Sequence, residues 1–491
     1  MAAAKCSVPG KAQIVTEDGE KTGRQAMKDF FKRLFGPVDM TEGSPVKQVL
    51  IFTIPMLIGN FAQQMYSTVD SIIVGRFVGD NALAAVGSAA PIVNLMLVLF
   101  IGISVGASVM VSQYFGARAR EELSRSIGSC ISLTGLASLI VMIAGPLISR
   151  PLLKLLGTPE SIIDWCTWYL IILFLGFAGT GYYNILGGVL RGLGDSISAL
   201  IYLLVATVIN IILDYIFVAW FGLGVPGVAL ATIIAQIVSA ILSIRKLMKM
   251  THLFDLKLDY VKPEWNYSKR LINLGLPAGL TQAIVSMSMV VVQSLTNSFG
   301  EMCIAANVIV MRVDGFVMLP AFSFGAAMTT FAGQNIGANR MDRVLKGTRN
   351  ITFVAMGISA FLSLLIFLFG RNLMGIFTKT GELVEISYHV MTILLVGYVA
   401  MEVTQCLSGV MRGAGDTMTP MWISLFNSVV MRVPLAYGLV AITKTPDLPQ
   451  GNFFMMATSL MITWVCGAFI TFILYKIGRW KGKGLVPAKE M

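Results

Sequence analysis

The chain has 491 residues, of which 56% are hydrophobic and only 13% are charged. A soluble domain carries about a quarter charged residues, so this composition excludes an ordinary soluble protein and indicates a polytopic membrane protein. The formal net charge of +11 does not indicate a nucleic-acid partner, because basic residues gather in the loops on one side of the membrane.

The first 48 residues are polar, and no cleavable signal peptide is expected because the first apolar run is already long enough to span a bilayer. Within this tail, hydrophobic residues recur at helical spacing from Ala26 to Phe35, with Lys28, Lys32 and Arg33 between them. That pattern predicts a short amphipathic helix on an anionic membrane surface, with a solvated linker as the alternative.

Apolar segments of spanning length then follow, six on each side of a polar loop. The fold class predicted is therefore an all-α polytopic membrane protein with twelve transmembrane helices. The segments are roughly 48–74, 83–113, 124–147, 163–188, 197–221, 225–248, 269–298, 303–333, 346–369, 384–409, 418–441 and 453–477.

The second half of the chain repeats the first. VLRGLGDSIS at 189–198 returns as VMRGAGDTMT at 410–419, and QYFGA at 113–117 returns as QNIGA at 334–338. Both repeats have the same offset, which spans an even number of helices. The sequence therefore predicts two parallel six-helix lobes related by an axis along the membrane normal, an architecture typical of transporters.

The predicted boundaries follow from this repeat and from the polar segments. They are a cytoplasmic tail at 1–48, an N-lobe at 49–250, a cytoplasmic loop at 251–268, a C-lobe at 269–477 and a cytoplasmic C-terminal tail at 478–491. Lys and Arg show a roughly fivefold excess in the loops on the side of the termini, which predicts that both termini are cytoplasmic.

An acid interrupts the first apolar segment. On a helix, Gln63, Tyr66, Ser67 and Asp70 share one face, because steps of three and four residues return to the same side. A carboxylate at membrane depth costs roughly 2.5–3.5 kcal/mol on insertion scales, so Asp70 is interpreted as functional. The alternative is a buried residue satisfied by hydroxyls and amides.

A second acid, Asp214, follows Asn210 by one turn on helix 5, and Thr232 lies on helix 6 beyond a short outer turn. Asp214 and Thr232 both lie about 12 Å below that turn at the 1.5 Å rise of a helix, a depth that Asp70 can share. Asp70, Asn210, Asp214 and Thr232 are thus predicted to form one site. Their oxygens suit Na⁺, and two close carboxylates would equally share a proton, so both ions remain open.

The C-lobe carries both signs of charge inside its helices. Arg312 and Asp314 point in nearly opposite directions on one helix, and Glu402 is expected to pair with Arg312 or with Arg432. We interpret these four residues as cavity residues or structural ion pairs. Tyr169 and Asn184 are weaker candidates for polar cavity residues of the N-lobe, together with Gln63 and Tyr66.

No nucleophile motif, phosphate-binding loop or cluster of metal ligands appears, so the sequence predicts no enzyme and no cofactor beyond a coupling ion. The six cysteines form no CxxC pair, and the two histidines lack metal-ligand spacing.

From about Pro45 to Ile477 the chain resembles the multidrug and toxic compound extrusion (MATE) family of prokaryotes. The resemblance rests on IPMLIGN and YSTVD in helix 1, QYFGA, the repeated VLRGLGD and VMRGAGD, NIILDYIF, and PGVALAT. It implies Na⁺- or H⁺-coupled antiport of amphipathic, often cationic, drugs or toxic compounds by alternating access. It also implies that Asp70, Asn210, Asp214 and Thr232 bind the coupling ion, as in the branch with an N-lobe cation site.

The resemblance further implies a multi-pass protein of a bacterial or archaeal plasma membrane, acting as a monomer, with amphipathic substrates and membrane lipid as its partners. The other branch of the family has an acid in helix 7, where this chain has Gln282 and Val285. Glu402 lies close to a helix 10 acid of that branch, which leaves open whether the C-lobe also couples an ion.

A flippase for a lipid-linked precursor is the alternative function, because such proteins share the superfamily and the lobes. A pyrophosphate-linked lipid would require several basic residues in the cavity. Only Arg312 and Arg432 are expected at membrane depth, both with acids available, so export of amphipathic compounds is favoured.

Overall fold

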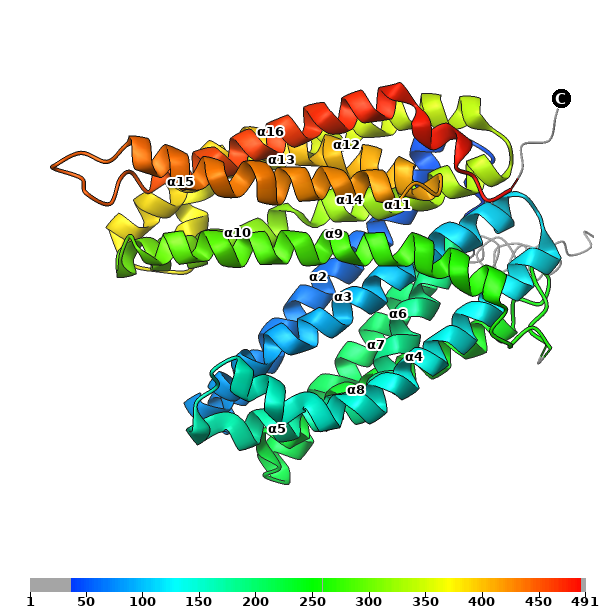
Figure 1. Ribbon diagram of the computed structural model, residues 1–491, viewed down its shortest axis with the longest axis horizontal. Coiled ribbons are helices and arrows are strands. Elements are labelled where there is room, and N and C mark those ends of the chain that lie inside the picture. The colour runs from blue at the N-terminus through cyan, green and yellow to red at the C-terminus, as the bar shows by residue number, and fades with distance from the viewer. Residues whose placement is uncertain (1–36, 258, 487–491) are drawn as a thin grey trace, which may run out of the picture.

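A computed structural model describes residues 37–257 and 259–486, and it shows two helical bundles that diverge like the arms of a V (Figure 1). The predicted amphipathic helix between Ala26 and Phe35 lies outside the described residues. Within helices α2 and α3 some side chains are also outside the description, those of Ser67 and Asp70 among them.

The N-lobe consists of seven α-helices and one π-helix. They are α2 (Pro45–Phe77), α3 (Asp80–Gly116), α4 (Arg120–Leu155), α5 (Glu160–Leu175), α6 (Phe177–Gly192), α7 (Ser196–Asp214), the π-helix η1 (Tyr215–Trp220) and α8 (Gly224–Met248).

The C-lobe contains the corresponding helices of the second repeat. They are α9 (Trp265–Asn297), α10 (Glu301–Val317), α11 (Leu319–Gly337), α12 (Met341–Gly375), α13 (Gly381–Gly413), α14 (Met418–Leu425), the π-helix η2 (Phe426–Met431), α15 (Arg432–Ile442) and α16 (Phe454–Ile477), before the short 3₁₀ helix η3 (Arg479–Gly482).

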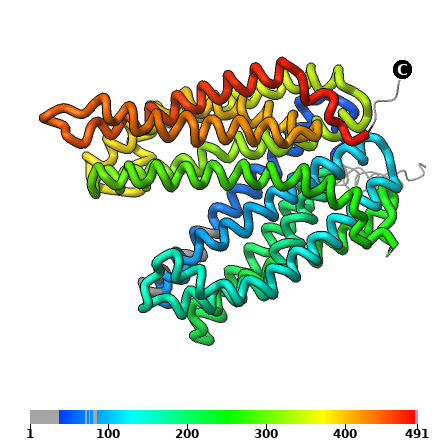
Figure 2. The backbone as a smooth tube through the Cα atoms, in the orientation of Figure 1, coloured from blue at the N-terminus to red at the C-terminus, as the bar shows by residue number. Residues whose placement is uncertain are grey.

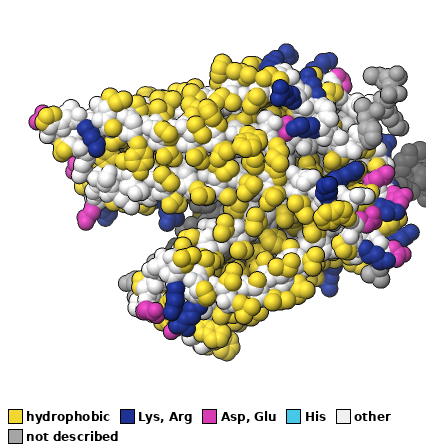
Figure 3. Space-filling model, viewed as in Figure 1, with side chains coloured by type: hydrophobic (Ala, Val, Ile, Leu, Met, Phe, Trp, Pro, Cys, Tyr) yellow, Lys and Arg dark blue, Asp and Glu magenta, His cyan; other side chains and the backbone are white. Residues whose placement is uncertain are grey.

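Twelve membrane spans are present among the described residues when the bent pair α5 and α6 counts as one. Eleven candidate spans meet length and apolarity requirements, and α5 and α6 meet them together across a 53° bend. Each of the predicted apolar segments falls on one span, which confirms the predicted fold class. The apolar side chains over the outside of both bundles (Figure 3) fit lipid contact.

The internal repeat extends to backbone conformation. The turns before α3 and α10 use Gly79 and Gly300 at φ 103° and 88°, and the turns after α6 and α13 use Gly194 and Gly415 at φ 87° and 94°. Positive φ values of this kind favour glycine because it has no Cβ. A π-helix interrupts the fifth span of each lobe, η1 in the first and η2 in the second.

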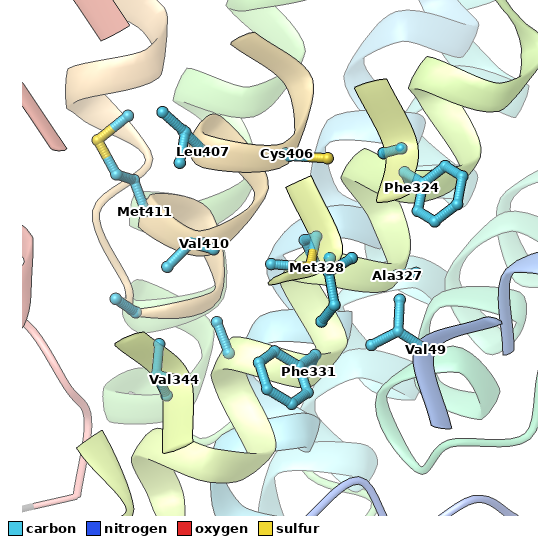
Figure 4. Packing of buried hydrophobic residues seen from close by; sticks show 14 of the residues in the cluster. Val49, Phe324, Ala327, Met328, Phe331, Val344, Cys406, Leu407, Val410 and Met411 are labelled. Carbon is cyan, nitrogen blue, oxygen red and sulfur yellow. The ribbon is translucent and has the colours of Figure 1, made fainter. Parts of the chain in front are cut away.

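Two helices, α2 and α9, pass from one bundle to the other, as the backbone tube in Figure 2 shows. The start of α2 packs in the C-lobe, where Val49 and Phe52 join a cluster with Phe331 and Val410 (Figure 4). Conversely, Leu271 at the start of α9 packs with side chains of α3, α4 and α6. Each crossing helix contains a proline, Pro55 in α2 and Pro277 in α9.

The bundles are closest where α3 meets α9. Gly102 and Gly106 of α3 face Gly275 and Gly279 of α9 so closely that a Cβ on Gly106 would lie 2.8 Å from the amide nitrogen of Gly275. The small-residue spacing of Gly102 and Gly106 therefore serves the contact between the lobes. This contact lies toward the end of the molecule that holds both described termini, and the V opens at the other end (Figure 1).

Candidate functional site

Helices α2, α7 and α8 pack together in the N-lobe and join three of the polar residues that the sequence analysis selected. The side-chain amide nitrogen of Asn210 donates to Oγ1 of Thr232 at 3.4 Å, and the hydroxyl of Tyr66 lies 3.3 Å from the same oxygen. Asn210 is 1% exposed. Thr232 thus links α2, α7 and α8 at one point.

Asp214 is the last residue of α7 and is fully buried. The π-helix η1 begins directly after it, at Tyr215. A π-helix inside a longer helix is rare and is frequently found at functional sites, because it redirects side chains and alters local hydrogen bonding. The change of helix type therefore marks the position of the acid that the sequence analysis selected on helix 5.

Asp70 lies on α2, but the placement of its side chain is outside the description. The predicted four-residue site therefore remains a prediction, with Asn210 and Thr232 in contact and Asp214 one turn from Asn210. Gln63 is exposed on α2. The described chain contains no group of three or more His, Cys, Asp or Glu residues that could hold a metal ion.

The chemistry available at this junction is that of oxygen. The Oδ1 atom of Asn210 is buried without a described hydrogen-bond partner, and Asp214, one turn farther along the chain, is also buried. Amide, hydroxyl and carboxylate oxygens suit a hard cation, and a buried carboxylate can alternatively take up a proton. The arrangement can therefore bind a small cation or a proton inside the N-lobe.

The remaining N-lobe candidates lie on α5 and α6. Tyr169 is buried in a hydrophobic cluster of α3, α5 and α8. Asn184 of α6 is half-buried, and its amide nitrogen donates to the carbonyl of Thr180 at 2.9 Å. Their role as cavity residues stays a prediction.

The C-lobe charges do not form the expected ion pairs. No salt bridge within 4 Å joins Arg312, Glu402 or Arg432 to another charge in the described part of the chain. Glu402 is 1% exposed inside the lobe, whereas Arg312 is exposed on α10. Asp314 instead lies near Tyr398 and Arg432.

The space between the arms of the V is a cleft (Figure 3). Its inward helices are α2 and α3 on one side and α9 and α10 on the other. All four helices carry exposed apolar side chains: Met65 of α2, Leu95 of α3, Val290 of α9 and Met311 of α10 are 42%, 53%, 72% and 53% exposed. The cleft therefore offers an apolar surface bounded by both lobes.

Hydrogen bonds join the two lobes at the closed end, and they were not predicted from the sequence. Gln113 of the N-lobe donates to the carbonyl of Gly413 in the C-lobe at 2.8 Å, and Gln334 of the C-lobe donates to the carbonyl of Gly192 in the N-lobe at 3.1 Å. All four residues belong to the repeated QYFGA and RGLGD segments. The common offset was the available signal, but it does not indicate that each glutamine contacts the opposite lobe.

The MatE family model matches residues 55–216 and 277–438, which together are well over half of the chain. The chain is 33% identical over 407 residues to a probable multidrug resistance protein, YoeA, of Bacillus subtilis, an alignment covering 81% of this chain and 88% of that protein. It is 25% identical to the multidrug export protein MepA of Staphylococcus aureus, over 77% of this chain and 84% of MepA.

Solved structures share the fold. A crystal structure of a MATE protein in complex with MaL6 matches with a TM-score of 0.84 at 24% identity, covering 91% of this chain and 98% of that one. A structure titled as the outward-facing conformation of a MATE family transporter matches with a TM-score of 0.82 at 24% identity, covering 90% and 98%.

Proposed function

The chain belongs to the MatE family of membrane transporters, and from this premise we propose that it is a secondary antiporter that exports amphipathic organic compounds in exchange for Na⁺ or H⁺. Family membership makes it a multidrug efflux transporter and not an enzyme. The coupling ion, its site and the substrate class are our proposals.

We propose that both termini are cytoplasmic in a plasma membrane, as the excess of Lys and Arg in the loops on that side indicates. With this orientation the V opens to the outside, and the closed end with Gln113 and Gln334 faces the cytoplasm. The chain then releases substrate outward in this state and takes it up after the closed end has opened. A monomer with a single cleft suffices for this cycle.

We propose that Asp70, Asn210, Asp214 and Thr232 bind the coupling ion. The observation that carries this assignment is the full burial of Asp214 directly before η1, one turn from Asn210, which donates to Thr232. A carboxylate in such a place is stabilised by a bound cation or by protonation. Because α2, α7 and α8 meet there, ion binding draws α2 against the N-lobe and so affects the helix that also packs in the C-lobe.

The test is transport in proteoliposomes with a Na⁺ gradient and a pH gradient imposed separately. One gradient is expected to drive substrate movement in the wild type. Asp214→Asn is expected to abolish gradient-driven transport while the protein still inserts and elutes normally. The matched control is Asp164→Asn, because Asp164 is an exposed acid of the same lobe, paired with Arg150 at 3.1 Å. Full coupled transport by Asp214→Asn would refute the site, and no response to either gradient would refute antiport.

A further inference from the structure

Arg312 is a charged residue in an unusual position. It lies eleven residues into α10, about 16 Å from the start of that helix at 1.5 Å per residue, which is near the middle of a hydrocarbon core about 30 Å thick. Among the described side chains, it is the one exposed charge on the central turns of α2, α3, α9 and α10. A charge at this depth faces protein or water, and it indicates a functional site.

The neighbours of Arg312 along α10 show which way it faces. Arg312, Gly315 and Phe316 are three and four residues apart and share one face of the helix. The ring of Phe316 lies 5.6 Å from that of Phe61 on α2, and a Cβ on Gly315 would lie 3.6 Å from the amide nitrogen of Gln64. Arg312 is therefore on the face of α10 that contacts the N-lobe.

The same face continues from that contact toward the open end. Because α10 begins at the tip of the V, Arg312 lies one turn farther out than Phe316 and Gly315 (Figure 1). The face of α10 opposite Arg312 carries Val310, two residues away, which is buried in the C-lobe core. Arg312 thus points into the cleft, one turn nearer its open end than the contact between α2 and α10.

None of the acids whose side chains the structure describes inside the two lobes pairs with Arg312. Asp214 and Glu402 are 0% and 1% exposed inside their lobes. Asp314 is two residues from Arg312, on the opposite side of α10, and lies near Tyr398 and Arg432. Within the described residues, no salt bridge joins Arg312 to a carboxylate.

We propose that Arg312 makes the cleft a binding site for amphipathic organic anions, with a carboxylate, sulfonate or phosphate on Arg312 and an apolar body against the cleft walls. A guanidinium binds such groups through two parallel hydrogen bonds. Met65 and Met311 offer pliable apolar contacts for the rest of the molecule. The inference rests on the proposed function of the cleft as the export route, and it departs from the preference for cations that the family resemblance implies.

Equilibrium binding to the purified full-length protein in phosphatidylcholine nanodiscs tests this proposal. The probes are dansylaminoundecanoate and the same dansyl chain ending in trimethylammonium, which differ only in the charge of the head group. The wild type is expected to bind the carboxylate at least about tenfold more tightly. Arg312→Gln is expected to weaken carboxylate binding by about tenfold, because it removes a charged hydrogen-bond donor to the carboxylate. It should leave binding of the ammonium probe unaffected.

Arg312→Lys, which keeps the charge, is expected to retain most of the carboxylate affinity. Arg371→Gln is the control, because Arg371 is an exposed arginine of α12 that pairs with Glu385 at 2.7 Å, away from the cleft helices. Tighter binding of the ammonium probe by the wild type, or equal weakening of both probes in Arg312→Gln, would overturn the proposal. Binding needs no gradient, so this result is independent of whether Na⁺ or H⁺ drives transport.

An anionic lipid head group has the same chemistry as the proposed ligand. The binding experiment is therefore repeated in nanodiscs that contain phosphatidylglycerol. Unchanged carboxylate affinity supports a soluble amphipathic anion as the ligand. Loss of carboxylate binding in these nanodiscs would overturn the proposal, since Arg312 would then be occupied by membrane lipid.

Discussion

Gln113 and Gln334 occupy equivalent positions in the two repeats, and each donates a hydrogen bond to a backbone carbonyl of the opposite lobe. Each also accepts a hydrogen bond from a segment near one end of the described chain: Oε1 of Gln334 from the amide of Met40 at 2.9 Å, and Oε1 of Gln113 from the amide of Leu485 at 2.6 Å. The two glutamines thus make equivalent hydrogen bonds between the lobes at the closed end, and the internal repeat relates them.

We expect Gln113→Ala and Gln334→Ala to favour opening of this end. Each substitution leaves a backbone carbonyl and a backbone amide without partners. For a buried group this costs about 1–3 kcal/mol in the closed state and nothing once water enters. Spin labels on Glu122 of α4 and Lys346 of α12, both exposed, would report the separation of the lobes by electron–electron double resonance. A larger population of long distances is expected.

The matched control is Gln282→Ala, which removes an exposed glutamine from α9. Its distance distribution should equal that of the wild type. If the two buried glutamine variants also leave the distribution unchanged, the cross-lobe bonds do not contribute to closure.

The glycine contact between α3 and α9 gives a second prediction. Gly106→Ala would bring a methyl group to 2.8 Å from the amide nitrogen of Gly275, and overpacking of this kind costs about 1–3 kcal/mol. The melting temperature in detergent should fall. Gly87→Ala is the control on the same helix, because nothing lies within 4 Å of a Cβ at that position. An equal melting temperature for Gly106→Ala and the wild type would show that the lobes separate easily here.

The sequence was sufficient to predict the number of spans and the two lobes, because apolar length and an in-register repeat are properties of the chain itself. It did not predict that α2 and α9 cross between the lobes. That crossing depends on where Val49 and Leu271 are buried, and both neighbourhoods consist of residues far away in the chain. Apolar residues predict burial, but they do not specify the lobe in which they are buried.

The candidate site was predictable to the same limited extent. The depth argument placed Asp214 and Thr232 at one depth, because antiparallel neighbours around a short turn share a depth. The contact that the structure describes instead joins Thr232 to Asn210, one turn before Asp214. The expected pairing of Glu402 with an arginine is absent among the described residues. Opposite charges in a sequence do not determine which face of one helix contacts which neighbouring helix. The exposure of Arg312 could not be deduced because it depends on the angle between the lobes.

The repeated aspartates of RGLGD and RGAGD give a third prediction. Asp195 accepts bonds from the amide and hydroxyl of Ser198 at 2.9 and 2.7 Å, and it lies 3.3 Å from Nζ of Lys246. Asp195→Ala is expected to lower the free energy of unfolding by about 0.5–2 kcal/mol as a lost helix cap. Thermal unfolding followed by size-exclusion chromatography measures this, with Asp259→Ala as an exposed control. Equal losses in both variants would contradict a capping role.

The loop between the lobes gives a prediction of pH dependence. The Arg120 guanidinium, which donates to both carboxylate oxygens of Asp255 at 3.1 and 2.9 Å, lowers the pKa of Asp255 below its ordinary value of 3.8. A lowered pKa in the folded state means that the pair stabilises the loop above the unfolded pKa. That contribution is lost as the pH falls through the folded pKa.

Amide hydrogen exchange over residues 251–257 should therefore show constant protection from neutral pH down to about 4, once the intrinsic pH dependence of exchange is removed, and lower protection below that. Asp255→Asn should show the lower protection at every pH, because its amide cannot replace the charge-assisted pair. Arg120 also donates to the carbonyl of Thr251 at 2.7 Å, so Arg120→Gln should loosen the loop further than Asp255→Asn. Protection in Asp255→Asn that matches the wild type at neutral pH would show that the backbone contacts alone hold the loop on α4.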